Sequence, residues 1–181
     1  MDLQGPPSVV EMSEQSSHEL ELTATRRLAF PLAQVWAACT TRESLEQWWS
    51  PEDLHTTVRR LELRAGGEVV FHVRYVPALL TPNGKEMFRA AGIPIAFDLR
   101  GRLSELTPER ILTFDLTLDL GKAGAGVQMI TRLELTADGD GTWVKVVASG
   151  KATPHWTTLG QQNLSSQLER LERTVSSRAR I

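Results

Sequence analysis

The chain has 181 residues, of which 41% are hydrophobic and 23% are charged, and its formal net charge is −2. This composition is that of an ordinary globular domain with a sizeable core, and it excludes a disordered chain and a strongly basic nucleic-acid-binding protein. No uninterrupted run of about 18 apolar residues occurs, so a transmembrane helix is excluded and we expect neither nucleic acid nor a membrane as a partner.

The N-terminal residues 1–18 are rich in acidic, proline and serine residues, and we predict that they form a disordered tail. They contain no apolar run of the kind that a secretory signal needs, so we expect no signal there. From Glu19 to Phe30, apolar and polar residues alternate with the period of two that is typical of a strand. Arg26 is the one charge on the apolar face of this strand. We therefore predict one domain over residues 19–178 that begins with a strand.

Two short helices are predicted after this strand. A proline opens the segment PLAQVWAACT, in which apolar residues recur at three- and four-residue spacing. Thr40 and Glu43 have the spacing of a capping box at the start of the second helix. This helix ends in two adjacent tryptophans, Trp48 and Trp49, before a Ser-Pro pair stops it.

Alternating apolar and polar residues between turn sequences predict six further strands, over about residues 57–64, 68–76, 93–106, 110–120, 127–136 and 142–149. Gly66, Gly67 and Gly101 are positions where such a sheet could bend. Residues 77–92 are expected to form a long hairpin or lid, and GKAGAG at residues 121–126 a turn.

A long helix begins at Thr153-Pro154 and continues to about residue 177 with a regular apolar stripe. The elements together predict an α+β fold, in which a curved antiparallel sheet of about seven strands packs around this C-terminal helix.

The run TRRLAFPLAQVWAACTTRESLEQWWSPEDL resembles the start of the bacterial homologues of the activator of heat-shock protein 90 ATPase. The matching positions are Arg26, Pro31, Val35, Trp36, Leu45, Trp48, Trp49 and Pro51. The stretches ELRAGGE, GRLSELTPERILTF and DGTWVKV resemble later turns and strands of that family, so the resemblance spans about residues 20–175. Two departures are Gly160-Gln161, where many members have Gly-Trp, and a longer segment between residues 76 and 101.

The resemblance implies a START-like (SRPBCC, Bet v-like) helix-grip fold with a cavity between the sheet and the last helix. Family members and relatives bind apolar small molecules there, and some relatives cyclise or dehydrate polyketides. The candidate ligand contacts are Arg26, Trp48, Trp49, Phe71, Tyr75, Phe97, Phe114, Met129, His155 and Trp156.

The inward-facing side chains that the alternation predicts are almost all apolar, from Phe71 and Ile95 to Val146. General acid–base catalysis needs an ionisable group near the substrate, and this lining offers only Tyr75, Arg26 and His155, which argues against a hydrolase. The four histidines are scattered in the sequence, so we expect no metal site, and no motif predicts a cofactor.

Two interpretations are open for each of three candidate residues, Trp48, Trp49 and Arg26. Trp48 and Trp49 either pack the base of the core, which we favour, or place one ring at the mouth of the cavity to stack on a ligand. Arg26 either forms an ion pair within the protein, which we favour, or contacts a ligand carboxylate or carbonyl.

Cys39 is predicted to be a small core residue, since nothing near it in the sequence would activate its thiol. As the single cysteine it excludes an internal disulfide and fits a reducing compartment, so we expect a cytoplasmic protein.

We favour a non-enzymatic function, the binding of a small apolar or aromatic molecule. A polyketide cyclase or aromatase is the first alternative, with Tyr75, Arg26 or His155 orienting an enolate. A co-chaperone-like module that stimulates an ATPase through an exposed apolar surface is the second. A homodimer is left open.

Overall fold

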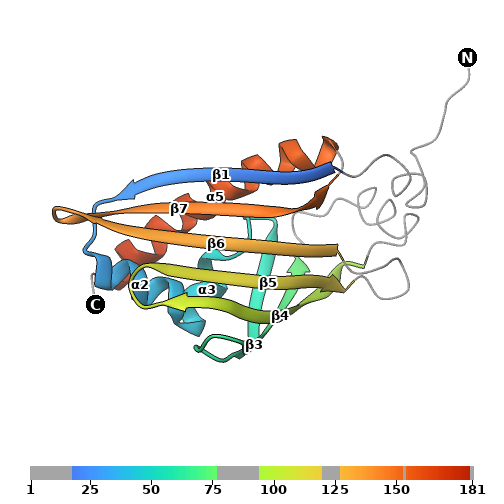
Figure 1. The fold of residues 1–181 in the computed structure, drawn as a ribbon, viewed down its shortest axis with the longest axis horizontal. Coiled ribbons are helices and arrows are strands. Elements are labelled where there is room, and N and C mark those ends of the chain that lie inside the picture. The colour runs from blue at the N-terminus through green and yellow to red at the C-terminus, as the bar shows by residue number, and fades with distance from the viewer. Residues whose placement is uncertain (1–17, 77–93, 120–126, 153, 180–181) are drawn as a thin grey trace, which may run out of the picture.

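The computed structural model describes residues 18–76, 94–119, 127–152 and 154–179 (Figure 1). In these ranges the chain forms one antiparallel sheet of seven strands and three helices. The predicted α+β fold, with a curved sheet and a long C-terminal helix, is confirmed. The predictions for residues 1–17, 77–92 and 121–126 lie outside the described residues.

The elements follow the predicted order along the chain. They are β1 (His18–Leu28), α2 (Leu32–Thr40), α3 (Arg42–Trp48), β2 (Leu54–Leu61), β3 (Gly67–Tyr75), β4 (Ala96–Thr107), β5 (Ile111–Asp119), β6 (Val127–Asp138), β7 (Gly141–Ala152) and α5 (Pro154–Arg178). β2 begins earlier than predicted because the chain turns at once after α3, where the Leu54 N–H donates to the Pro51 carbonyl at 3.1 Å.

The strands lie in the order β1-β7-β6-β5-β4-β3-β2. The chain therefore returns to β1 only with its last strand, and β1 and β2 are the two edges. In Figure 1, β3 runs steeply across the direction of β5 and β6, so the sheet is strongly curved. Two register shifts, between Val58 and Arg60 and between Leu103 and Glu105, accompany this curvature.

The helices lie on the inner side of the curved sheet. α5 runs along β1 and β7, and α2 and α3 pack at the end of the sheet where α5 finishes (Figure 1). The apolar stripe of α5 faces the sheet, with Leu164, Leu168, Leu171 and Val175 all buried. Hydrophobic burial against the sheet is therefore what holds this helix in place.

The predicted capping box is wrong. Thr40 is the last residue of α2, and its hydroxyl donates back to the Trp36 carbonyl at 2.8 Å. Thr41 occupies the N-cap position of α3, but its hydroxyl donates to the Ala37 carbonyl at 2.9 Å and makes no cap bond. Only one residue separates the two helices, and both threonine hydroxyls bond back to carbonyls of the last turn of α2; the Ala37 carbonyl also accepts the Thr41 N–H at 3.1 Å.

Gly66 and Gly101 are needed where they stand. Gly66 has a φ of 76°, in the left-handed region that glycine adopts without strain. At Gly101 in β4, a Cβ atom would lie 1.9 Å from the Asp115 carbonyl oxygen of β5. The absence of a side chain thus lets the two strands approach beside the register shift.

We expect Gly101→Ala to lower the free energy of unfolding by about 2 kcal/mol, because the two strands must separate to admit the methyl group. Urea denaturation measures this change. Thr117→Ala, on the exposed face of β5 opposite Arg100, is the matched control and should cost less than about 1 kcal/mol. Equal stability of Gly101→Ala and the parent would contradict the close approach.

Candidate functional site

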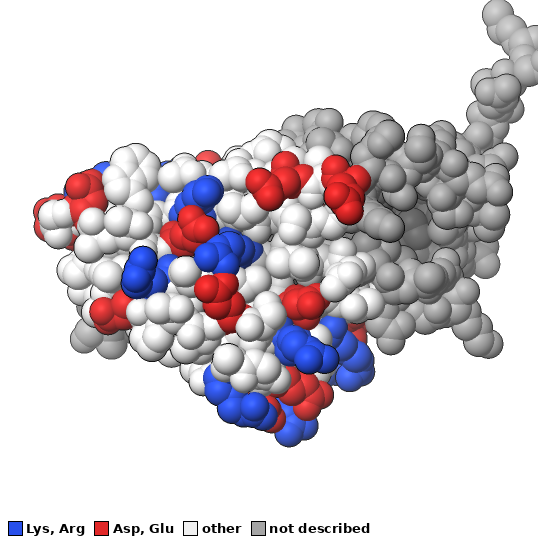
Figure 2. Space-filling view, viewed as in Figure 1, with Lys and Arg blue, Asp and Glu red and all other residues white. Residues whose placement is uncertain are grey.

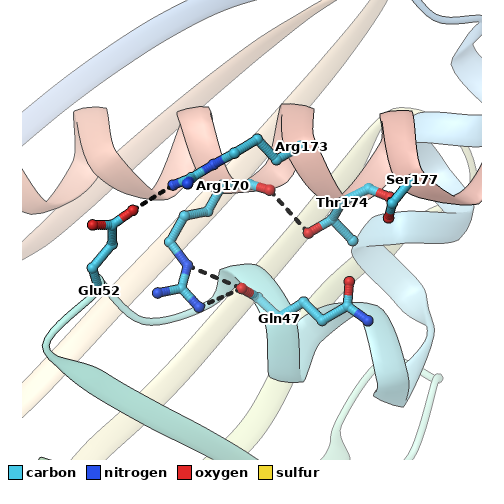
Figure 3. A pocket seen from close by; sticks show the side chains of 6 residues that line it. All are labelled: Gln47, Glu52, Arg170, Arg173, Thr174 and Ser177. Carbon is cyan, nitrogen blue, oxygen red and sulfur yellow. Dashed lines mark hydrogen bonds and ion pairs between the residues drawn. The ribbon is translucent and has the colours of Figure 1, made fainter. Parts of the chain in front are cut away.

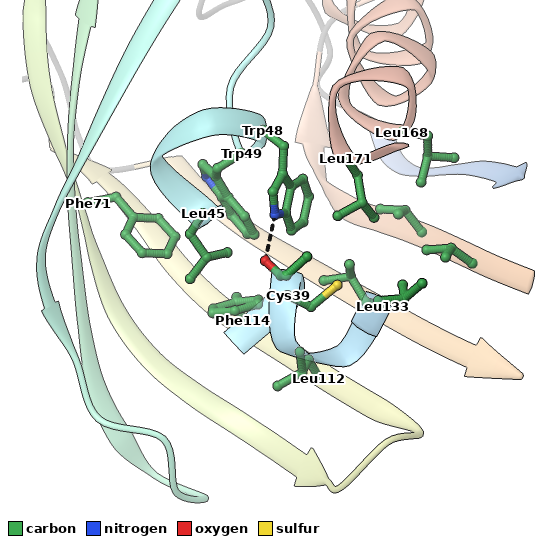
Figure 4. Close-up of a cluster of buried hydrophobic side chains, with 14 of the residues drawn as sticks. Cys39, Leu45, Trp48, Trp49, Phe71, Leu112, Phe114, Leu133, Leu168 and Leu171 are labelled. Carbon is green, nitrogen blue, oxygen red and sulfur yellow. Dashed lines mark hydrogen bonds between the residues drawn. The ribbon is translucent and has the colours of Figure 1, made fainter. Parts of the chain in front are cut away.

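Four aromatic side chains fill the inner space at the end of the sheet nearest α2 and α3 (Figure 4). The ring centroid of Trp49 lies 4.8 Å from that of Phe71 and 4.8 Å from that of Phe114, in edge-to-face geometry. Trp48 lies 5.8 Å from Trp49. All four are at most 4% exposed. This agrees with the core-packing interpretation of the tryptophans, and a contact of these rings with a ligand stays a prediction.

The tryptophan pair also connects the three helices. The indole N–H of Trp48 donates to the Ala38 carbonyl of α2 at 2.9 Å (Figure 4). The Trp49 carbonyl accepts a hydrogen bond from the side-chain amide of Gln167 in α5. The end of α3 is therefore bonded to both of the other helices.

The inner face of the sheet becomes more exposed away from this aromatic cluster. On β3, Phe71 is 0% and Val73 1% exposed, whereas Tyr75 is only partly buried. The other inward-facing side chains at the same end of the sheet are also only partly buried. These residues, here called the open end, are Leu22, Tyr75, Phe97, Leu118, Met129 and Ala148.

The strand register makes the open end a continuous surface. Leu22 faces Ala148 across β1 and β7, Val73 faces Phe97 across β3 and β4, and Leu116 faces Met129 across β5 and β6. Sequence reasoning selected Tyr75, Phe97 and Met129 as ligand contacts but missed the other three members of the open end. Strand alternation alone could have identified Leu118 and Ala148, because each lies two residues from a buried inner side chain, Leu116 and Val146 respectively.

Arg26 lies on the inner face of β1 and is held by α5. Its Nε and Nη2 atoms each lie 2.7 Å from Oε2 of Glu172, and its Nη1 lies 3.9 Å from Glu169. The favoured interpretation, an ion pair within the protein, is confirmed. Because the side chain is 40% exposed, this pair is partly screened by water.

Tyr75 is the titratable side chain of the open end. Burial first, and the charge of Asp53 second, raise the pKa of its hydroxyl. The hydroxyl is therefore protonated at neutral pH and can donate a hydrogen bond. Of His155 and Trp156, both in the first turn of α5, the side chains lie outside the described residues.

One inward-facing prediction is wrong. Ile95 is 57% exposed, although alternation with Phe97 placed it inside. It precedes the start of β4 at Ala96, in a bend, and its carbonyl accepts the Tyr75 N–H at 2.9 Å. The period of a strand therefore does not extend to this residue.

Cys39 is a core residue, as predicted. Its side chain is 1% exposed, and burial raises the pKa of the thiol to about 12. The thiol is therefore neutral at pH 7, and a neutral thiol is a poor nucleophile.

The structure shows no group of three or more His, Cys, Asp or Glu side chains able to hold a metal ion in its described part. Likewise, none of the helices it describes is both long and apolar enough to cross a membrane.

Charges of both signs are interspersed on the face seen in Figure 2, which includes no large patch of one sign among its described atoms. This mixed face is typical of a solvated surface.

The chain matches one family model, described as "Activator of Hsp90 ATPase homolog 1-like protein", over residues 29–176. A search of curated proteins found no match. The matched range runs from the end of β1 into the last turns of α5 and thus includes the aromatic cluster and most of the open end.

Solved structures share the fold. Protein CV1439 from Chromobacterium violaceum is 23% identical, with 86% of this chain and 96% of that chain covered and a TM-score of 0.63. Protein NE0264 from Nitrosomonas europaea is 24% identical, with 90% and 97% covered and a TM-score of 0.64. DynU16, described as a protein in the dynemicin biosynthetic locus, is 14% identical, with 86% of this chain and 47% of that chain covered and a TM-score of 0.60.

We expect Trp48→Phe to lower the free energy of unfolding by about 3 kcal/mol, because it removes the donor to the Ala38 carbonyl and leaves part of a buried volume empty. Thermal or urea denaturation tests this. Trp143→Phe, at a tryptophan that is 43% exposed, is the control and should change stability by less than about 0.5 kcal/mol. Similar losses for the two variants would show that Trp48 is not a structural link.

Cys39 should resist thiol reagents in the folded state. With a pKa of about 12 and almost no exposure, the thiol is expected to react with 5,5′-dithiobis(2-nitrobenzoate) at pH 8 at least about 100-fold more slowly than in urea. Absorbance of the released thiolate measures both rates. Fast reaction without denaturant would mean that α2 opens readily.

Proposed function

This chain belongs to the family of activator of Hsp90 ATPase homolog 1-like proteins, and from this premise we propose that it binds an apolar or aromatic small molecule at the open end of the sheet. The observation that carries the proposal is the change from complete to partial burial along the inner face. A core that only stabilised the fold would have no reason to leave one end of its apolar surface accessible.

The open end offers mainly hydrophobic contact. Its described members are a phenylalanine, a tyrosine, a methionine, two leucines and an alanine. If a ligand covered about 200 Å² of their apolar surface, the gain would be roughly 5 kcal/mol before the costs of association. Micromolar binding corresponds to about 8 kcal/mol net, so such a ligand would have to bury more apolar surface and form polar contacts in addition.

The polar groups near the open end favour a neutral ligand with an oxygen acceptor. The Tyr75 hydroxyl is protonated and lies at the open end, and the guanidinium of Arg26 is bonded to Glu172. A charged ligand would have to leave water without an opposite charge beside it, which costs free energy. We therefore expect aromatic ketones or phenols to bind more tightly than free carboxylates.

A cyclase or aromatase remains the alternative that a particular residue favours. A protonated tyrosine beside an apolar surface can donate a hydrogen bond to a developing enolate oxygen, which is the stabilisation such a reaction needs. Of the residues considered for this role, Arg26 is already held by two glutamates of α5. Tyr75 is therefore the described side chain on which a catalytic function would depend, and that of His155, the third candidate, lies outside the described residues.

The co-chaperone hypothesis has less support. It requires a contiguous exposed apolar surface, but the large apolar side chains that are exposed lie on separate elements of the described chain: Leu63 after β2, Ile95 before β4, Ile130 on β6 and Trp143 on β7. Apolar residues scattered singly are ordinary on protein surfaces.

The test uses N-phenyl-1-naphthylamine, a neutral aromatic probe whose fluorescence rises in apolar surroundings. Met129→Trp should weaken its binding at least about tenfold, because the larger ring occupies part of the open end. Ile130→Trp, the next residue on the same strand, is the matched control, since its side chain points outward and is 36% exposed. Circular dichroism confirms that both variants fold. Identical titrations of the parent and the two variants would refute the site.

A further inference from the structure

A polar hollow of about 420 Å³ lies beside the second half of α5, away from the open end of the sheet (Figure 3). It is bounded by α5, by the end of α3 and by the turn that precedes β2. Its lining side chains, here called the arginine hollow, are Gln47, Glu52, Arg170, Arg173, Thr174 and Ser177. Nothing in the proposed binding of an apolar molecule uses these residues.

Arg170 brings a positive charge into the hollow without a carboxylate partner in the described structure. Its Nε and Nη2 donate to the Gln47 carbonyl at 2.9 and 2.5 Å. A carbonyl oxygen satisfies hydrogen bonds but does not neutralise the guanidinium charge. The remaining N–H groups of this guanidinium have no acceptor among the described residues, and a guanidinium has five in a planar fork.

The charge of the hollow is only partly balanced. Burial first, and the neighbouring charge of Arg173 second, lower the pKa of Arg170. Glu52 is the one carboxylate of the lining, and it pairs with Arg173 at 2.7 Å. The Glu52 side chain is 66% exposed, so water competes for this pair and the carboxylate can leave at small cost.

Neutral donors surround the two arginines. The Gln47 side-chain amide extends along the same side of the hollow as Thr174 and Ser177 (Figure 3). The hydroxyls of Thr174 and Ser177 now donate to carbonyls of α5, at Arg170 and Thr174 respectively. A tetrahedral anion with several acceptor oxygens would satisfy such a set of donors better than a planar carboxylate.

We propose that the arginine hollow binds a phosphate group, either inorganic or carried by a small molecule. Arg170 and Arg173 supply the charge, and the Gln47 amide supplies a neutral hydrogen bond; the Ser177 hydroxyl adds another when it rotates away from the Thr174 carbonyl. The volume exceeds that of a phosphate ion, so part of a phosphate ester can enter as well. In the absence of the anion the Glu52 carboxylate pairs with Arg173, and the anion must displace it from Arg173 to bind there.

The competition with Glu52 makes the proposal testable in two directions. Inorganic phosphate is titrated into the full chain at pH 7 and low ionic strength, and binding is followed by calorimetry. Glu52→Gln should bind phosphate at least about fivefold more tightly than the parent, because no carboxylate then competes for Arg173. Arg173→Gln should bind it at least about tenfold more weakly.

The control removes the same charge elsewhere. Arg110→Gln, at an exposed position before β5, should leave phosphate affinity within about twofold of the parent. Arg170 is not used as the first variant because it also holds α3, and circular dichroism confirms that the variants tested are folded. Acetate at equal ionic strength tests whether a carboxylate suffices, and glucose 6-phosphate tests whether an ester is accepted.

The outcomes separate clearly. Tighter binding by Glu52→Gln together with weaker binding by Arg173→Gln supports the site, and saturable binding of glucose 6-phosphate extends it to esters. The proposal is overturned if phosphate does not bind saturably, if acetate binds equally well, or if Arg110→Gln weakens binding as much as Arg173→Gln.

Discussion

The packing of one indole between two phenylalanine rings determines the shape of this molecule. Trp49 follows α3 in the chain, Phe71 belongs to β3 and Phe114 to β5, and their rings meet edge to face. β3 and β5 are separated in the sheet by β4 and diverge in direction, so a large side chain is needed to fill the space between them. The curvature of the sheet and the position of α3 therefore depend on each other. The rings therefore fill one end of the inner face, where the described core is complete.

The helices also protect the two edges of the sheet, which would otherwise expose unpaired backbone groups. On β1, the Thr23 carbonyl accepts a hydrogen bond at 3.0 Å from the side-chain amide of Gln161 in α5. On β2, the Val58 N–H donates at 2.8 Å to the Glu46 carboxylate of α3. The same two helices thus bury the inner face and satisfy part of each edge. This dual role explains why short α3 is held by so many side-chain bonds to the rest of the molecule.

Local patterns in the sequence were sufficient for the elements but not for the contacts between them. The period of two located the strands, and the resemblance over the first helices identified the helix-grip arrangement. Prediction failed at the ends of elements: Thr40 is the last residue of α2 and bonds back into it, and Ile95 lies just before β4. The arginine hollow could not be predicted, because it joins Arg170 to a backbone carbonyl 123 residues away, and a carbonyl carries no sequence signal. Burial along a strand was likewise not predictable, since it depends on which helix covers each end.

The second half of α5 is fixed to the rest of the molecule by both polar and apolar contacts. In the second half, Gln167 bonds to the Trp49 carbonyl and Arg170 to the Gln47 carbonyl, while Leu168 and Leu171 are buried against the sheet. These contacts hold this half on α3 and on the aromatic cluster, where the core is complete without a ligand. The open end lies at the opposite ends of the strands, beyond this fixed region. The residues that fix this half of α5 and the residues of the open end are therefore separate sets. A phosphate bound in the arginine hollow would contact Gln47 of α3 and Arg170 and Arg173 of α5. It would thereby add to the contacts that already hold the second half of α5 on α3.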